Sequence, residues 1–286
     1  MRIKVLILAA GFGERLEKSV LEATNLTSAE QEALLLRLGM VMPKGLLPIN
    51  GIPILTRLAS QLKEVPGINI SDDVFLVTNS HFHEEFFIWG QNFGLHPTHI
   101  FSNGVMRPED RFGAVADMVF AIKQGRIADG LLVLSSDTLF SDFHLRELVE
   151  AVTINNGHDT FPVYRENPEL MSRRAQVIFN ANDDGEIVHF AEKPKKPKRT
   201  PYIYASPCIY FYSASTVQNN LPQYASKYSG QLDKLDAPGI FNEALFKSGK
   251  RMLAIIMSGQ RFDVGNLQGW RETDQFFCEK ERVMAR

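Results

Sequence analysis

Runs of apolar residues alternate with amphipathic stretches along most of this chain. The first run, Ile3–Ala10, is short, rich in β-branched residues and uninterrupted, which predicts a strand buried on both faces of a sheet. Similar runs at Val74–Thr78, His99–Ser102 and Leu131–Leu134 predict further strands. Helical patterns lie between these runs, and we expect helices at Ile52–Leu62, Phe82–Trp89, Gly113–Lys123 and Phe143–Asn155.

From Asp159 onward the pattern changes. Two apolar stretches, Ala175–Asn180 and Glu186–Glu192, flank the turn sequence Asp183-Asp184-Gly185, which predicts an antiparallel hairpin. Because strands that alternate with helices form covered parallel sheets, we expect an α/β fold. Its sheet is mixed but mostly parallel and flanked by helices, with a smaller antiparallel β element in the second half. The remaining expected elements are strands at Pro207–Tyr212 and Met252–Met257 and helices at Ser213–Leu221, Gly239–Ser248 and Leu267–Glu281.

The composition is that of a globular protein with a large core. Of 286 residues, 44% are hydrophobic and 22% charged, and we expect a single domain over residues 1–286. The net charge of −2 favours neither nucleic acid nor a membrane surface as a partner. Cys208 and Cys278 lack metal-ligand spacing and fit a reducing compartment. The amino terminus lacks a signal-peptide pattern and Ile3–Ala10 is too short to span a bilayer, so we expect a cytoplasmic protein.

The first predicted strand runs into a loop that suits phosphate. Gly11 and Gly13 allow the backbone to approach a ligand and to point its N–H groups inward, and Arg15 adds a guanidinium. The pattern is neither the P-loop nor the dinucleotide-binding motif, because no third glycine follows. Taken alone, this loop fits a tight strand-to-helix turn with a surface arginine equally well.

A second segment, Pro43–Pro48, favours the phosphate-binding interpretation. It reads Pro-Lys-Gly-Leu-Leu-Pro, and Leu8–Arg15 reads Leu-Ala-Ala-Gly-Phe-Gly-Glu-Arg. In this order the two segments resemble the sugar-phosphate nucleotidyltransferases, such as glucose-1-phosphate thymidylyltransferases and uridylyltransferases. That family carries Leu-Ala-Ala-Gly-x-Gly-x-Arg and then Pro-Lys-x-Leu-x-Pro. The resemblance covers nearly the whole chain and implies a Rossmann-like nucleotidyltransferase fold.

The resemblance implies an enzyme that joins a nucleoside triphosphate to a sugar 1-phosphate and releases pyrophosphate. Residues 1–158 would then bind the nucleotide and residues 159–286 the acceptor. Arg15 and Lys44 are the implied catalytic cations. The implied nucleotide-binding residues are Leu8, Ala9, Ala10, Gly11, Gly13, Gly113 and Ser136.

Two aspartates stand in contexts that suit a divalent cation. Asp137 follows an apolar strand, and Asp263 lies two residues before Gly265. Mg²⁺ prefers oxygen ligands and often takes only one or two from the protein. Each aspartate alone is more often a helix cap or turn residue. The family has an aspartate in each context, so the resemblance implies that both bind Mg²⁺.

The acceptor residues are implied by two further matches. Glu192-Lys193-Pro194 matches the family's Glu-Lys-Pro, in which the glutamate binds sugar hydroxyls and the lysine the sugar phosphate. Tyr210 ends a match to Thr-Gly-x-Tyr near the sugar, although Cys208 replaces the glycine.

Other departures leave the specificity open. Pro108–Arg111 stands where thymidylyltransferases carry a base-reading glutamine, and Arg174-Ala175 replaces a Tyr-Gly. The sequence therefore determines neither the base nor the sugar.

Residues 17–41 form an insertion between the two phosphate motifs, about twice as long as the family's loop. Overlapping capping boxes in Thr27–Gln31, the leucines of Leu34–Leu38 and Gly39 predict a helix there. Three roles stay open for it: packing on its own domain, a lid over the site, and a contact in a homodimer.

Two other functions also stay open. A cytidylyltransferase for a non-sugar phosphate such as phosphocholine would need a cage for the ammonium group. The candidates for such a cage are Tyr202, Tyr204, Tyr210 and Tyr212. A nucleotide-sugar-binding subunit without turnover is the second alternative, and the intact Arg15, Lys44, Asp137 and Asp263 argue against it.

Overall fold

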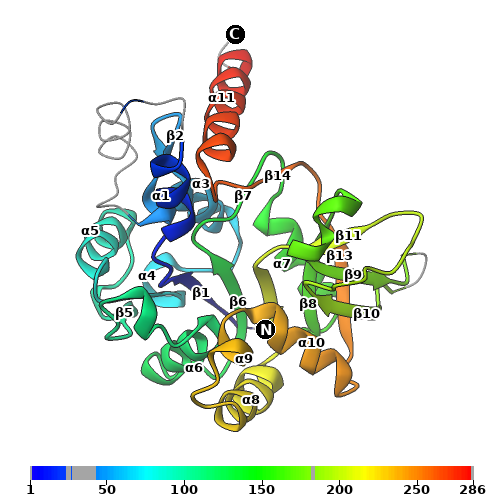
Figure 1. Ribbon diagram of the computed structural model, residues 1–286. Helices are drawn as coiled ribbons and strands as arrows, with labels where there is room; N and C mark the ends of the chain where they lie inside the picture. Colours follow the sequence, from blue (N-terminus) through cyan, green and yellow to red (C-terminus); the bar gives the residue numbers. More distant parts are fainter. Residues whose placement is uncertain (1, 24–26, 28–42, 182–183, 285–286) are drawn as a thin grey trace.

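The computed structural model describes residues 2–23, 27, 43–181 and 184–284, and its first half alternates strands and helices as expected (Figure 1). The strands of this half are β1 (Ile3–Ala9), β2 (Pro48–Ile49), β3 (Ile52–Pro53), β4 (Val74–Thr78), β5 (Ile100–Ser102), β6 (Gly130–Ser135) and β7 (Leu139–Phe140). The helices are α1 (Glu14–Leu21), α3 (Ile54–Ser60), α4 (Ile70–Asp73), α5 (His83–Phe93), α6 (Ala114–Gln124) and α7 (Leu145–Ile154), with 3₁₀ turns at Lys44–Leu46, Gln61–Glu64, Pro97–His99 and Pro108–Asp110.

The second half contributes more strands than the sequence predicts. They are β8 (Asp159–Arg165), β9 (Ala175–Phe179), β10 (Ile187–Glu192), β11 (Tyr204–Ser206), β12 (Ile209–Tyr212), β13 (Met252–Ile256) and β14 (Arg261–Phe262). The helical segments are a 3₁₀ helix at Pro168–Arg173, a π-helix at Thr216–Asn220, and α8 (Leu221–Lys227), α9 (Leu232–Leu235), α10 (Pro238–Lys247) and α11 (Leu267–Met284).

A ten-stranded sheet joins the two halves. Its order is β10-β9-β11-β8-β12-β6-β1-β4-β5, with β13 paired to β8. Strands β6, β1, β4 and β5 pair in parallel, whereas β12 pairs antiparallel with β6, and β8 to β11 continue mostly antiparallel. The expected fold class is therefore confirmed. Figure 1 shows β5 and the β9–β10 hairpin at opposite ends of the sheet.

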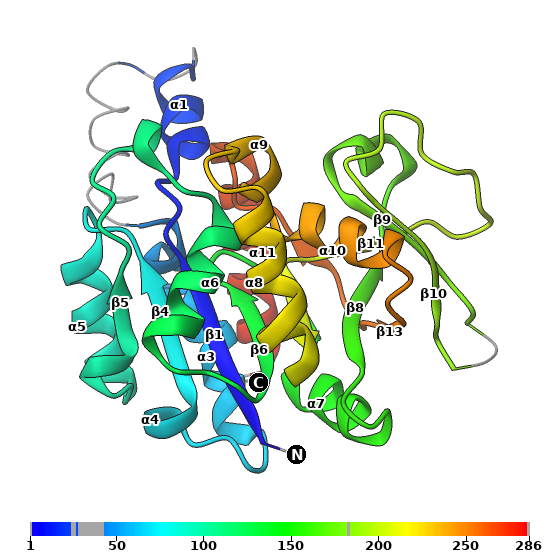
Figure 2. The ribbon, with the colours of Figure 1, turned by 90° about the horizontal axis from the view of Figure 1, so that it is seen from below.

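Helices cover both faces of the sheet because the central strands are apolar on both sides. All seven residues of β1 are buried; Ile7 belongs to the core on one face and Leu6 to the core on the other. The first core receives side chains from α3, α5 and α7, and the second from α6, α8 and α10. Figure 2 shows α6 and α8 on one side of β1 and α3 on the other. This arrangement leaves the carboxyl ends of β1, β4 and β6 at one edge, which is where ligands bind in such sheets.

A third apolar cluster joins the two ends of the chain. Leu16 and Val20 of α1 pack with Trp270 and Phe277 of α11. The Trp270 Nε1–H donates to the carbonyl oxygen of Pro48 at 3.1 Å, which ties α11 to β2 as well. Residues 17–21 of the predicted insertion thus continue α1. The helix expected within 28–39 lies outside the described residues.

No helix in the part of the chain that the structure describes is long and apolar enough to cross a bilayer.

Candidate active site

The glycine loop lies at the carboxyl end of β1 and is held there by its neighbours. The Thr78 hydroxyl donates to the carbonyl oxygen of Ala9 at 3.2 Å, and the Asn79 amide donates to that of Ala10 at 3.1 Å. Gly13 has a φ of 76° and begins α1, a conformation that side chains rarely adopt. A Cβ on Gly11 would meet no atom within 4 Å, so the loop borders open space.

The second motif packs directly against the turn after β6. A Cβ on Gly45 would lie 2.8 Å from Ser136 Cβ, so only glycine permits this approach. The close packing places Lys44 beside Asp137, with 2.6 Å between Nζ and Oδ2. Two motifs that are separate in the sequence therefore meet at one point.

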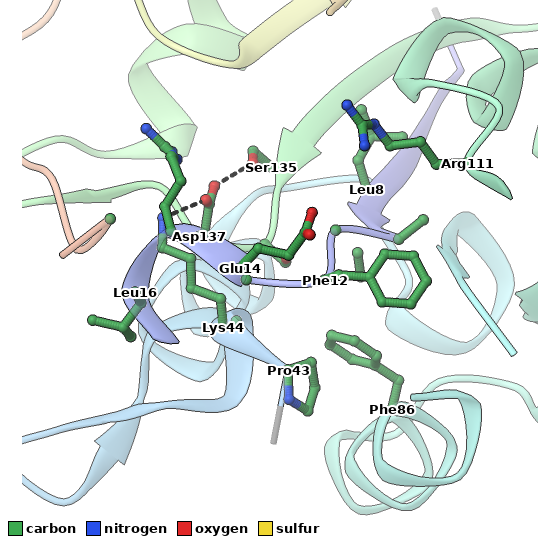
Figure 3. Close-up of a pocket in the computed structure, with 18 of the residues that line it drawn as sticks. Leu8, Phe12, Glu14, Leu16, Pro43, Lys44, Phe86, Arg111, Ser135 and Asp137 are labelled. Atoms are coloured by element: carbon green, nitrogen blue, oxygen red, sulfur yellow. Dashed lines mark hydrogen bonds and ion pairs between the residues drawn. The ribbon is translucent and has the colours of Figure 1, made fainter. Parts of the chain in front are cut away.

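Asp137 is fixed from two sides. Lys44 contacts one carboxylate oxygen, and the Ser135 hydroxyl donates to the other at 2.6 Å. Figure 3 shows these two residues on either side of Asp137. Burial opposes ionisation of this carboxyl, but the Lys44 ammonium and the Ser135 hydroxyl outweigh it and hold the pKa of Asp137 well below its usual range.

Asp263 is brought to the same place by a short ribbon. β7 follows Asp137 and pairs antiparallel with β14, with Phe262 opposite Leu139. Continuing this register puts Asp263 beside the residues that precede Leu139, and hence near Asp137. Lys44 and Arg261 each lower the pKa of both carboxyls. Asp137 lines the first cleft described below and Asp263 the second, which adjoins it.

Asp263 also has its own fixed partners. Its Oδ1 accepts the Gly265 N–H at 3.0 Å, and its Oδ2 lies 2.8 Å from Nη2 of Arg174 and 3.8 Å from Nη1 of Arg261. Burial raises the pKa of Asp263, but the two guanidinium groups outweigh it and the pKa lies below its ordinary value. Both aspartates are thus held as carboxylates.

A first cleft of about 300 Å³ lies along the glycine loop. It brings together most of the residues that the sequence predicts for nucleotide binding and catalysis. These residues are Leu8, Ala9, Ala10, Gly11, Gly13, Arg15, Lys44, Ser136 and Asp137.

The far end of the first cleft has a polar pair that the sequence did not reveal. Arg111 and Asp236 line it, with Arg111 Nε 3.4 Å from Asp236 Oδ1, and Figure 3 shows Arg111 beside Leu8. Gly113 does not line the cleft. It has a φ of 92°, and a Cβ there would lie 2.4 Å from the carbonyl oxygen of Leu235. Its visible role is to let α9 approach; a nucleotide-binding role stays a prediction.

A second cleft of about 840 Å³ adjoins the first, and Arg15 and Gly265 line both. Of the predicted acceptor and metal residues, Lys193 and Asp263 line it. Sequence reasoning missed its other cations. They are Arg173, Arg174 and Arg261, of which Arg174 was visible only as a departure from a family motif.

Lys193 and Glu192 are held differently at the end of β10. Lys193 has a φ of 45°, and its N–H donates to the carbonyl oxygen of Arg174 at 3.0 Å. Such a left-handed non-glycine residue stores backbone strain, a common feature of binding sites. The Glu192 carboxylate packs against Gly239, where a Cβ would lie 1.9 Å from Oε2. Burial raises the pKa of Glu192, Lys193 lowers it and Glu243 raises it, with a net increase.

Cys208 precedes β12 and is a protonated thiol. Burial, followed by the charges of Asp137 and Glu192, raises the pKa of its thiol to about 12. The thiol therefore stays protonated at neutral pH.

Three of the four candidate cage tyrosines are engaged in other contacts. Tyr210 and Tyr212 are buried in the second core around Phe161, with ring centroids 5.1 and 5.7 Å from it. The guanidinium carbon of Arg165 lies over the Tyr202 ring, 4.3 Å from its centroid. Tyr210 lines neither cleft, so its visible contacts are those of a packing residue. This arrangement removes the support for the phosphocholine alternative.

Ionised carboxylates at two adjoining clefts, Asp137 and Asp263, have the oxygen chemistry that suits Mg²⁺, which commonly takes one or two carboxylates and completes its shell with water and substrate phosphates. Among the described residues no group of three or more His, Cys, Asp and Glu side chains is placed to hold a metal ion. A Mg²⁺ site at the two aspartates therefore stays a prediction.

Comparison with known proteins agrees with this geometry. Residues 35–280 match the model of the nucleotidyl transferase family, and the chain belongs to that family. It aligns with a glucose-1-phosphate adenylyltransferase of Ruminiclostridium cellulolyticum at 29% identity over 145 residues, which is 50% of this chain. The match spans 32%, about a third, of that relative's length.

The fold is shared with a solved structure. It is described as a "putative glucose-1-phosphate thymidylyltransferase" from Bacillus anthracis in complex with a sucrose. The TM-score is 0.67 at 20% identity, and the match covers 96% of this chain and 94% of that one. At this identity the likeness concerns the fold alone.

Proposed function

We propose that this protein transfers the nucleotidyl group of a nucleoside triphosphate to a sugar 1-phosphate, giving a nucleoside-diphosphate sugar and pyrophosphate. The supporting observation is the border between the two clefts, where Arg15 and Gly265 line both. The first cleft is lined largely by the glycine loop, as a nucleotide phosphate site requires. The second is lined by cationic side chains, as a phosphorylated acceptor requires. Such adjacency holds two reactants together for an in-line displacement.

The reaction needs no side-chain nucleophile. An oxygen of the acceptor phosphate forms a bond to the α-phosphorus, the bond from that phosphorus to the bridging oxygen breaks, and pyrophosphate leaves with the electron pair. Arg15 and Lys44 stabilise the charge that grows on the leaving oxygens. Lys193 holds the acceptor phosphate and Glu192 the sugar hydroxyls.

Asp137 and Asp263 would hold Mg²⁺ between the clefts. When bound, the cation neutralises charge on the triphosphate. Lys44 and Arg174 keep the two carboxylates ionised and oriented until substrate arrives, because each contacts one of them within 2.8 Å. In this way Arg174 acts as a positioning residue for Asp263.

Pyrophosphate release from a panel of nucleoside triphosphates with sugar 1-phosphates tests the proposal. We expect release with at least one pair of substrates, dependent on Mg²⁺. We expect the rate of release to fall about a hundredfold in Lys44→Ala. It should persist in the control Lys63→Ala, because Lys63 lies in the 3₁₀ turn Gln61–Glu64 and lines neither cleft. Release with phosphocholine alone, or none with any acceptor, would contradict the proposal.

A further inference from the structure

The second cleft has a surplus of fixed positive charge. Its cationic residues are Arg15, Arg173, Arg174, Lys193 and Arg261, and its acidic residues are Asp263 and Glu272. Within the described ranges, neither Arg15 nor Arg173 has a carboxylate within 4.0 Å. Their charges are therefore available to a ligand.

The acids near the other cations do not remove this surplus. One oxygen of Asp263 faces both Arg174 and Arg261, at 2.8 and 3.8 Å, so one negative charge is shared by two guanidinium groups. Glu166 holds Arg174 alone, at 3.1 Å from its Nε. If Asp263 also serves a metal ion, its charge is committed further. Arg261 is then left without a dedicated counter-ion.

The arginines are placed next to the residue proposed to bind the acceptor phosphate. Lys193 is joined to Arg174 by a backbone hydrogen bond of 3.0 Å, and Arg173 is the preceding residue. The side chains of Lys193, Arg173, Arg174 and Arg261 all line the second cleft. A ligand bound by Lys193 in this cleft therefore shares it with guanidinium groups.

We propose that the acceptor carries a second anionic group besides its 1-phosphate, and that Arg173 and Arg261 bind this group. The inference rests on the function proposed above. Guanidinium forks pair bidentately with a carboxylate or a phosphate, and both groups have the required chemistry. Once Lys193 binds the 1-phosphate, a sugar with only hydroxyls elsewhere would offer Arg173 and Arg261 no anionic partner of their own.

Direct binding separates this inference from the catalytic proposal. Titration calorimetry compares glucose 1-phosphate, glucuronic acid 1-phosphate and glucose 1,6-bisphosphate on the same protein. We expect at least one of the two doubly anionic acceptors to bind at least tenfold more tightly than glucose 1-phosphate. The tighter of these two identifies the second group as a carboxylate or a phosphate.

Variants then test the arginines. Arg173→Gln and Arg261→Gln should each reduce the preference at least fivefold. The control Arg146→Gln, an exposed residue of α7 paired with Glu150, should keep it. Equal binding of the three acceptors, or no binding of any, overturns the inference. The inference is also overturned if both variants bind the triphosphate as much more weakly as they bind the acceptor, because the arginines then serve the triphosphate. Selective binding without pyrophosphate release overturns the catalytic proposal alone.

Discussion

The two clefts lie against each other and share Arg15 and Gly265, yet they are built from different parts of the chain. Most residues of the first come from three contiguous segments, at the carboxyl ends of β1 and β6 and at the 3₁₀ turn of Lys44–Leu46. The second collects side chains from the end of one 3₁₀ helix, the end of β10, β14 and the start of α11. Backbone geometry thus shapes the first cleft, whereas side-chain charge characterises the second.

The largest effect is expected where the two clefts meet. Asp137→Asn keeps the shape but removes the charge that faces Lys44, so we expect the rate of pyrophosphate release to fall about a thousandfold, or about 4 kcal/mol. The exposed Asp72→Asn is the matched control and should keep the wild-type rate. A rate within threefold of wild type at limiting Mg²⁺ would remove Asp137 from the site.

Arg15 distinguishes stabilisation of the transition state from ground-state binding. Because charge grows on the leaving pyrophosphate, Arg15→Ala should lower kcat about a hundredfold and raise KM for the triphosphate much less. Lys18→Ala, on the same helix and paired loosely with Glu22 at 3.7 Å, is the control. An unchanged kcat with a raised KM would show uniform binding instead.

Substitutions at two glycines of the first cleft should have different effects, one on stability and the other on ligand binding. Gly45→Ala forces a methyl group against Ser136, so we expect the free energy of unfolding to fall by about 1–3 kcal/mol. Gly11→Ala places its methyl group in open space, so stability should hold while triphosphate binding weakens. Urea unfolding and calorimetry measure the two effects. Equal losses of stability in both variants would contradict this division.

The two clefts also differ in how well the sequence predicts the elements that form them. The apolar run of β4 and the glycine loop are continuous in the chain, so their places were predictable. The position of β8 was not predictable, because Pro162 lies inside this strand and lacks the N–H that a central strand normally donates to its neighbour. β7 and β14 have two residues each, too few for a pattern, yet their pairing brings Asp263 to Asp137.

The second cleft was harder to predict for a different reason. Arg174 differs from the family's motif, and Arg261 lies next to one without belonging to it. Their common role depends on the folded arrangement around Asp263. Tyr210 shows the reverse case, since it matches a motif but lies in the core. Motif matching finds groups that are contiguous, and it passes over charges that only the fold assembles.

The last expected effect concerns stability and its dependence on pH, away from the residues that line the two clefts. Asp117 is buried in the first turn of α6, and its Oδ1 accepts a hydrogen bond from the Asn103 amide at 2.8 Å. Burial raises the pKa of Asp117 from 3.8 to about 6, against the lowering effect of Asn103. The folded state therefore binds a proton more tightly than the unfolded state, and this group's contribution to stability grows as the pH falls from above 6 toward 4.

Asp117→Asn removes the buried charge. At pH 7 we expect its free energy of unfolding to exceed that of the wild type by about 1–3 kcal/mol, and the difference should vanish near pH 4. Denaturant unfolding between pH 4 and 8 measures it. A difference that does not change with pH would mean that Asp117 does not titrate in this range.

The central claim is that Asp137 and Asp263 act together on one cation between the clefts, and a double-mutant cycle tests it most directly. The rate of Mg²⁺-dependent pyrophosphate release is measured for Asp137→Asn, Asp263→Asn and the double variant. If both carboxylates serve one ion, the double variant should be no more than about threefold slower than the slower single variant. A double variant that shows the full product of the two single losses would mean that the aspartates act independently and would contradict the account.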